Sequence, residues 1–546
     1  MAEPKITRQR QGKYTYLYES VPFWNKEKKY PDNDKDSIGK VDPLTGEDMY
    51  KPGYLAKLKS QGVETRGMRV WDRARLARSS FGGGTAKGFS EEIANILDEV
   101  KDFGTMYFLT SIADSIGLLG TLKSALPHEW EHVFDIACYL VSTDRAAMYC
   151  DDWSDETFGT ASEDLSSQRV SDTYASIGFA ERIAFYRAWA KLVREREYLA
   201  LDITSISSYS EGIKQCEMGH NRDNEKLTQV KVCILCGEKT HMPVYLTLYS
   251  GSLSDVATLE CTLDEFEGVT GEAGYMVVMD KGNFSLKNLR ALNGANGRRT
   301  LFLIPAPFTT TWANMMAGSE MEGIDRPSNV ILTSGEPVRG VHRPGTMKGI
   351  GFLHAHVFFD PERALKKRNA LYDYVARLKV EAKRDAANPK LQKEFAHYLA
   401  AGPAFGIRED VVADELKTAG WLVLASNHID DPQLAHETYR AKDAVEKAFM
   451  AYKDMLGLHR LRVHGDLRME NKLFVAFVAL ALFSHIHYVM KAKKLYDRMT
   501  FNKLMITMAK LKSVKVGGNL ILRPVTRAQK DIFDAFGIAC PRGADL

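Results

Sequence analysis

Residues 199–203 read LALDI, a carboxylate inside an apolar run of the kind that forms a buried β-strand. A second such run, YMVVMD at residues 275–280, ends on a carboxylate as well. Carboxylates are rarely buried unless they are paired or have a task, so Asp202 and Asp280 require an explanation. An aspartate at a strand end is more often a turn cap, and that alternative stays open for Asp280.

Segments typical of strands and helices surround these two runs in a definite order. We expect three strands at residues 198–205, 230–236 and 243–249. A helix at 255–266, a strand at 275–280, a helix at 285–292 and a strand at 300–304 should follow them. Three antiparallel strands followed by alternating helices and parallel strands is the order of a ribonuclease H-like sheet, whose first and fourth strands are neighbours. Asp202 and Asp280 should therefore lie close together.

A later helical segment carries a line of polar side chains. Tyr439, Lys442, Glu446 and Lys453 fall within one arc roughly 60° wide when successive residues are about 100° apart. An apolar stripe lies beside this line, so the polar residues follow the rim of a buried face. One hydroxyl, two ammonium groups and a carboxylate could together hold a metal ion and a phosphodiester backbone. A glutamate on a charged helix more often faces solvent, and that reading of Glu446 alone stays open.

In these residues the chain resembles the DDE transposases of bacterial insertion sequences. It is most similar to the branch marked by Tyr, two residues, Arg, three residues, Glu, six residues and Lys. Tyr439, Lys442, Glu446 and Lys453 match this spacing, with Lys442 where the family has Arg. Three further stretches are similar to motifs of the family. DITSIS at 202–207 is similar to the strand that carries the family's first Asp, SGSLSD at 250–255 to its G-N-x-S-D turn, and MDKG at 279–282 to its D-R-G motif.

The resemblance implies a DNA transposase that binds terminal inverted repeats, cleaves DNA at the element ends and joins the 3′-hydroxyl ends to target DNA. It implies that Asp202, Asp280 and Glu446 are the catalytic residues and the ligands of two Mg²⁺ (or Mn²⁺) ions, which prefer oxygen ligands. Double-stranded DNA is then the partner, both as transposon ends and as target, bound by a homodimer. Two alternatives stay open: a nuclease of the same fold without strand transfer, and a catalytically silent DNA-binding protein derived from a transposase.

The same resemblance assigns DNA contacts. Tyr439, Lys442 and Lys453 are expected to hold phosphates of the transposon end. Lysine at position 442 keeps a cation but lacks the planar, bidentate fork of arginine. Arg460 and Arg462 are further candidates for backbone contacts on charge alone, although a solvated surface explains them equally well.

Composition narrows the class of protein. The 546 residues carry a formal net charge of only +3, so any DNA affinity must come from local clusters. The seven cysteines are few and irregularly spaced, which fits a reducing cytosol rather than a disulfide framework. Residues 1–14 lack an apolar signal core, and the apolar run at 473–490 is interrupted by a serine and two histidines, which favours a buried helix over a membrane span. We therefore expect a cytoplasmic protein with no membrane partner, and the resemblance implies the bacterial cytosol, with association to the nucleoid when bound to DNA.

Four residues have the spacing of zinc ligands, namely Cys216, His220, Cys233 and Cys236. On a strand, however, Cys233 and Cys236 are three residues apart and point to opposite faces. The pattern favours buried core cysteines over a structural zinc.

The whole chain is expected to be an α/β protein with a ribonuclease H-like catalytic core, that is, a mixed five-stranded sheet with helices. The connection before Glu446 is too long for a loop, so we expect a β-containing insertion subdomain there, with helical regions at both ends of the chain. We expect an N-terminal arm or small, loosely packed domain that could contact DNA at residues 1–65, and a helical DNA-binding or dimerisation region at 66–197. The first part of the core follows at 198–305, the insertion at 306–434 and the completion of the core with Glu446 at 435–490. A basic C-terminal region occupies residues 491–546.

Overall fold

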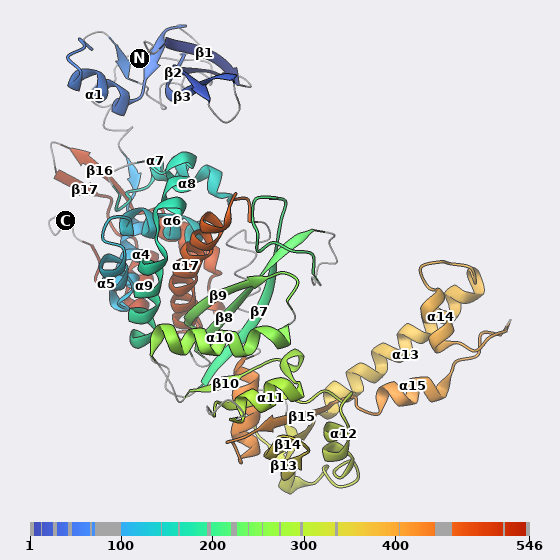
Figure 1. The fold of residues 1–546 in the computed structure, drawn as a ribbon. Coiled ribbons are helices and arrows are strands. Elements are labelled where there is room, and N and C mark those ends of the chain that lie inside the picture. The colour runs from blue at the N-terminus through green and yellow to red at the C-terminus, as the bar shows by residue number, and fades with distance from the viewer. Residues whose placement is uncertain are drawn as a thin grey trace. The chain divides into compact units, whose positions relative to one another are not determined.

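A computed structural model describes most of the chain. The described residues are 5–11, 14–25, 30–41, 46–65, 68–70, 100–143, 145–161, 164–193, 198–219, 227–237, 240–253, 255–271, 275–294, 299–333, 337–402, 404–442, 461–516 and 519–541. They belong to two compact units, Met1–Val100 with Val514–Asn519 and Lys101–Ser513 with Leu520–Leu546. Figure 1 labels the elements of both units.

The first unit is a small β domain. Its sheet has the strand order β1-β2-β3-β4-β5, and Leu17, Ile38, Met49 and Leu55 are buried within it. Its described elements are β1 (Lys5–Gln11), β2 (Tyr14–Asn25), β3 (Tyr30–Val41), β4 (Asp48–Tyr50), α1 (Pro52–Ser60) and β5 (Arg69–Val70). Of the two expectations for this region, an arm or a small domain, the structure has the domain. Polar residues separate its few buried side chains, so the strands leave little periodicity in the sequence.

A layer of helices opens the second unit. Its described helices are α4 (Gly104–Ser115), α5 (Leu118–Ala125), α6 (Trp130–Ser142), α7 (Cys150–Glu156), α8 (Ser167–Ser176) and α9 (Phe179–Leu192). The side chain of Ser166 accepts a hydrogen bond from the Arg169 backbone N–H, which is the cap that starts α8. The next helix, α9, begins only after Gly178, whose backbone N–H donates to the Glu181 carboxylate. The helical prediction for this region is confirmed over residues 104–192.

The centre of the second unit is a sheet whose described strands have the order β12-β13-β14-β15-β11-β10-β7-β8-β9. Its expected part consists of β7 (Tyr198–Ser208), β8 (Thr228–Gly237), β9 (Pro243–Ser250), α10 (Asp255–Thr270), β10 (Met276–Val278), α11 (Leu286–Leu292) and β11 (Leu301–Pro305). Strands β7, β8 and β9 are antiparallel, whereas β10 runs parallel to both β7 and β11. The order β9-β8-β7-β10-β11 is that of a ribonuclease H-like sheet, and it confirms that the first and fourth strands are neighbours.

The region at 306–434 differs from its prediction, because its strands continue the core sheet instead of forming a separate subdomain. Strand β15 pairs antiparallel with β11, which would otherwise present an open sheet edge. The strands are β12 (Val330–Ile331), β13 (Val338–Met347), β14 (Gly351–Phe359) and β15 (Trp421–Ser426), and the helices are α12 (Thr311–Gly318), α13 (Pro361–Arg384), α14 (Gln392–Tyr398) and α15 (Glu409–Leu416). Only α13, α14 and α15 pack around small cores of their own.

Helix α17 (Asp466–Ala492) is long and apolar enough to cross a membrane by length and composition alone. In the structure, 78% of its most apolar window is buried, and it packs against α6, α8 and β9. This burial is that of a core helix, as the interrupted apolar run predicts. Other described elements are β6 (Lys101–Asp102), η1 (Ala147–Tyr149), η2 (Lys281–Asn283), η3 (Pro327–Asn329), η4 (Leu495–Asp497), α18 (Phe501–Met508), β16 (Lys512–Val516), β17 (Asn519–Leu522) and α19 (Arg527–Phe536).

Candidate active site

The two candidate aspartates occupy different positions on neighbouring strands. Asp202 lies within β7, where it pairs with Ile234 of β8, and it is half-buried. Asp280 follows β10 with an extended backbone, φ −81° and ψ 159°. Its carboxylate accepts a hydrogen bond from the Lys281 backbone N–H at 2.7 Å. Asp280 therefore caps the turn with one carboxylate oxygen, and its other oxygen remains available to bind another group.

The strand register brings the two aspartates together. In the parallel pairing of β7 with β10, Val278 lies opposite Ala200. The Met279 backbone N–H still bonds to the Leu303 carbonyl of β11, so the ladder continues past the last residue of β10. Asp202 and Asp280 each follow the last pair, Ala200 with Val278, by two residues, so the same register, continued, sets Asp280 opposite Asp202. Neighbouring strands are about 4.8 Å apart, and paired residues in parallel strands share a face, so on this register the two carboxylates belong to one face of the sheet.

The same face of the sheet is covered by the helix at residues 432–442. A buried cluster joins Met276 and Val278 of β10 to Leu424 of β15 and Ala435 of this helix, and Tyr439 packs against it. Side chains alternate along a strand, so Asp280 belongs to the face of Val278 and Asp202 to the face of Ala200. By this alternation Tyr439 and the two aspartates belong to one face of the sheet.

Lys442 is buried, with its side chain only 2% exposed, and it interacts within the fold. Its contact with a phosphate of the transposon end stays a prediction. Glu446, Lys453 and Arg460 lie outside the described residues.

Arg462 is described, and it lies away from the aspartates. The backbone N–H of the preceding residue, Leu461, bonds to the carbonyl of Ser207 in β7. Ser207 is five residues beyond Asp202, or about 16 Å along a strand. Arg462 itself has a φ of 48°, an uncommon backbone conformation for a side chain other than glycine. Any DNA contact of Arg462 would therefore be separate from the chemistry at Asp202.

The donor set suits a hard divalent cation. Asp202 and Asp280 supply carboxylate oxygens, which Mg²⁺ prefers, and Mg²⁺ is commonly held by one or two carboxylates together with substrate phosphates. Within the described residues, His, Cys, Asp and Glu form no group of three or more that could hold a metal ion, and the third predicted ligand, Glu446, is not among them.

The cysteines of the predicted zinc alternative lie on the sheet or beside it. Cys233 and Cys236 are buried in β8, and Cys216 is half-buried. The Cys233 sulfur lies 3.6 Å from the Thr262 hydroxyl of α10, which donates to it. His220 lies outside the described residues. Cys233 thus packs against α10 as a core cysteine.

Three histidines that the sequence reasoning did not single out share the face of the aspartates. His342 of β13 pairs with His356 of β14, and His342 Nε2 lies 2.9 Å from His354 Nδ1. His356 is fully buried and donates from Nε2 to the Ile429 carbonyl. Burial lowers the pKa of His356 to about 4, although the bond to Ile429 opposes the shift. His354 and His356 are two residues apart in a strand, and this spacing in the sequence indicates that both side chains lie on one face.

Acidification is expected to destabilise the protein through His356. The folded state holds this imidazole neutral down to about pH 4, whereas the unfolded chain protonates it near pH 6.5. The unfolded state thus binds more protons below pH 6.5, and stability falls as the pH drops from 6.5 to 4, by up to about 3 kcal/mol. Urea unfolding at a series of pH values measures this slope. The variant His356→Gln should show a flatter slope over the same interval, and an unchanged slope would contradict the assignment.

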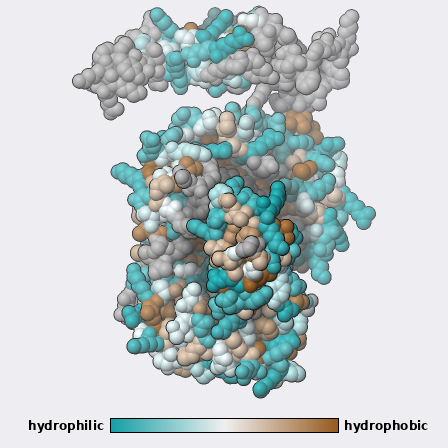
Figure 2. Space-filling model, turned by 90° about the vertical axis from the view of Figure 1, so that its right-hand side faces the viewer, coloured by the Kyte–Doolittle hydropathy of each residue, from teal (hydrophilic) through white to brown (hydrophobic). Residues whose placement is uncertain are grey.

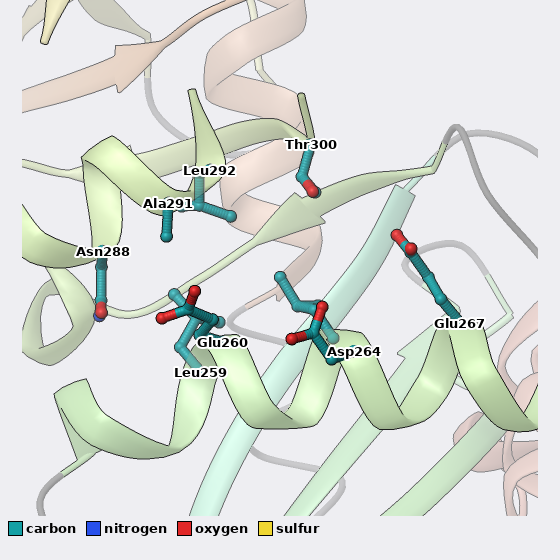
Figure 3. Close-up of a pocket in the computed structure, with 9 residues that line it drawn as sticks. Leu259, Glu260, Asp264, Glu267, Asn288, Ala291, Leu292 and Thr300 are labelled. Carbon is teal, nitrogen blue, oxygen red and sulfur yellow. The ribbon is translucent and has the colours of Figure 1, made fainter. Parts of the chain in front are cut away.

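A surface pocket between α10 and α11 is separate from this site. Figure 3 shows Glu260, Asp264 and Glu267 of α10 in a row along it, with Thr300 at its rim. Thr300 precedes β11, and therefore lies at the opposite end of the parallel strands from Asp280. The pocket has no part in the arrangement at Asp202 and Asp280.

A ribonuclease H-like sheet with one aspartate in its first strand and another after its fourth is an arrangement typical of nucleases and polynucleotidyl transferases. Residues 194–482 match the family model described as "Transposase DDE domain", and the chain belongs to this family. A cryo-EM structure of the piggyBac transposase synaptic complex with hairpin DNA is similar at 12% sequence identity and a TM-score of 0.31. The similarity covers 57% of this chain and 51% of that chain, so this chain spans about half the length of the piggyBac chain it matches. No curated protein matches the chain.

Proposed function

We propose that this protein is a DNA transposase that binds the inverted repeats of an insertion sequence, cleaves at the element ends and joins the 3′-hydroxyl ends to target DNA. The observation that carries the proposal is the parallel register of β7 and β10, whose last pair, Ala200 with Val278, lies two residues before Asp202 and Asp280. Membership of the transposase family supports it. Because two ends must be handled together, we propose a symmetric homodimer on DNA.

In this proposal Asp202, Asp280 and Glu446 hold two divalent ions against the scissile phosphate. Ions bound there would supply activation of the attacking oxygen and charge stabilisation of the leaving oxygen in an in-line displacement. The protein's own contribution is positional. The ladder of β7 fixes Asp202, and the hydrogen bond from the Lys281 N–H orients Asp280. Tyr439, packed over the same face, borders the place where the DNA backbone would lie.

Strand joining separates a transposase from a nuclease of the same fold. With Mg²⁺, a duplex carrying a pre-cleaved transposon end is expected to become covalently joined to plasmid DNA. Gel electrophoresis of a labelled end detects the joined product. The same end with a 3′-deoxy terminus is the control and should give none, because the 3′-hydroxyl is the nucleophile. Cleavage of the duplex without any joined product would favour the nuclease, and the absence of both activities would favour the silent DNA-binding protein.

A further inference from the structure

Helix α13 leaves the sheet from the edge at which Asp280 lies. His356 of β14 pairs with Leu424 of β15, and Leu424 pairs with Pro305 of β11. Continued by two residues, the register of β10 with β11 sets Asp280 opposite Pro305. His356 and Asp280 therefore lie at the same height along the strands. Three strand spacings separate them, or about 14 Å. Strand β14 runs in the direction of β10 and ends at Phe359, directly before α13.

Helix α13, together with α14 and α15, forms a helical arm between β14 and β15 (Figure 1). The later part of α13 is held by the arm's own cores, through Leu371, Val375, Leu378 and Ala382. By contrast, none of residues 361–370, all of which are described, is buried. In these first turns Ala364 lies against Gly420, and the Lys367 ammonium donates to the Glu415 carbonyl at 3.4 Å. The side chains of Arg363, Lys366 and Arg368 are exposed and form no part of a core.

Those first turns are strongly basic. Residues 361–370 contain Arg363, Lys366, Lys367 and Arg368, all exposed, against one acid, Glu362. Among the described residues, no carboxylate forms a salt bridge with Arg363, Lys366 or Arg368. Further along α13 two arginines are paired, Arg377 with Asp373 at 2.8 Å and Arg384 with Glu381 at 3.8 Å. Among the described residues, Lys379 and Lys383 form no salt bridge. Residues 361–370 carry four cations against one acid, whereas residues 371–384 carry four cations against two acids, so the excess of cations per residue is larger at the start of the helix, next to the sheet.

An exposed arginine from another element lies beside this basic segment. The ring of His436 lies 5.1 Å from that of Phe358 near the end of β14. Arg440 is one helical turn after His436 in the helix at 432–442, on the same side of that helix, and it is exposed. Arg440 thus extends the cationic surface of α13 toward the helix that carries Tyr439.

We infer that the first turns of α13 and Arg440 form a binding site for the phosphate backbone of duplex DNA, beside the candidate catalytic aspartates. The inference rests on the proposed function and adds to it where the duplex is gripped. The charges on the arm indicate from which side the duplex approaches. The outer face of α15 carries the exposed acids Glu409, Asp410 and Asp414, which repel phosphates, so the duplex approaches from the α13 side. Figure 2, in which the arm points toward the viewer, shows many hydrophilic residues around the tip of the arm.

The test replaces Arg363, Lys366 and Arg368 with glutamine in the full chain. Binding to a short, fluorescently labelled duplex of mixed sequence is measured by anisotropy at several KCl concentrations, in EDTA so that no cleavage occurs. Each phosphate contact contributes about 0.9 to the slope of log affinity against log salt, so the triple variant should lower the slope by about 3. The matched control replaces Lys383, Lys390 and Lys393, which are exposed at the far end of the arm, and should leave the slope within about one of the wild type.

Equal loss in both triple variants would overturn the inference, because the effect would then be one of total charge. An unchanged slope together with an altered oligomeric state in light scattering would also overturn it, since the surface would then be a protein interface. Because binding is measured without chemistry, a protein that fails to join DNA ends can still show the expected slope. Failure of the proposed function and failure of this site are thus distinguishable.

Discussion

Replacing Asp202 with asparagine is expected to lower the rate of DNA cleavage and joining by at least about a thousandfold. Metal-assisted phosphoryl transfer draws several kcal/mol of transition-state stabilisation from its ions, and about 4 kcal/mol corresponds to a thousandfold in rate. Asparagine keeps the shape and the strand pairing of Asp202 but not its charge. DNA binding in EDTA should remain unchanged, which separates lost chemistry from lost structure. The joining assay with a pre-cleaved end measures the rate.

Asp264→Asn is the matched control, because Asp264 lines the pocket of α10 and α11 away from the site. It should keep activity within about twofold, as surface substitutions away from a site do little. Glu446→Gln should behave as Asp202→Asn does if the helix supplies the third carboxylate. Wild-type cleavage in Asp202→Asn would remove the basis of the proposed site, whatever the fold.

The variant Asn471→Leu is expected to destabilise the protein by about 3 to 5 kcal/mol, the cost of breaking a buried polar network. Asn471 of α17 is fully buried, and its amide donates to the carbonyls of Tyr174 and Ile177, each at 2.8 Å. Its oxygen accepts a hydrogen bond from Arg182 of α9, which also bonds to Glu470. Leucine fills a similar volume but leaves two carbonyls and a guanidinium N–H without partners.

Chemical denaturation followed by circular dichroism measures this loss. The control is Gln168→Ala on α8, since Gln168 makes only an exposed bond to Asp172, and its effect should stay within about 0.5 kcal/mol. If Asn471→Leu proved as stable as the wild type, the network would contribute nothing net to the packing of α17 on α8 and α9.

The order of the first five core strands could be predicted because each strand is decided locally. Residues 199–203 and 275–280 are apolar runs of strand length, and turn residues separate them from their neighbours. Residues 361–384 carry a proline at the start and a long charged pattern, both typical of a helix, and α13 spans these residues. Such signals depend on neighbours along the chain, which the sequence contains in full.

Strand β13 could not be predicted, because it contains Gly340, Pro344 and Gly345, residues that argue against a strand. Its pairing with β14 explains one of them: a Cβ at Gly340 would lie 2.7 Å from the Phe358 ring and 2.3 Å from the Ile331 side chain. The requirement for glycine there arises from contacts between strands, and no local pattern expresses it.

The sequence by itself determined the strand order that makes Asp202 and Asp280 neighbours, since alternation and apolar runs are properties of adjacent residues. Only the tertiary structure decided that β12–β15 extend the same sheet, that Lys442 is buried and that α13 begins at the edge where Asp280 lies. These features depend on which surfaces far apart in the chain remove each other from water. Burial of that kind is set by the whole fold and not by the residues on either side.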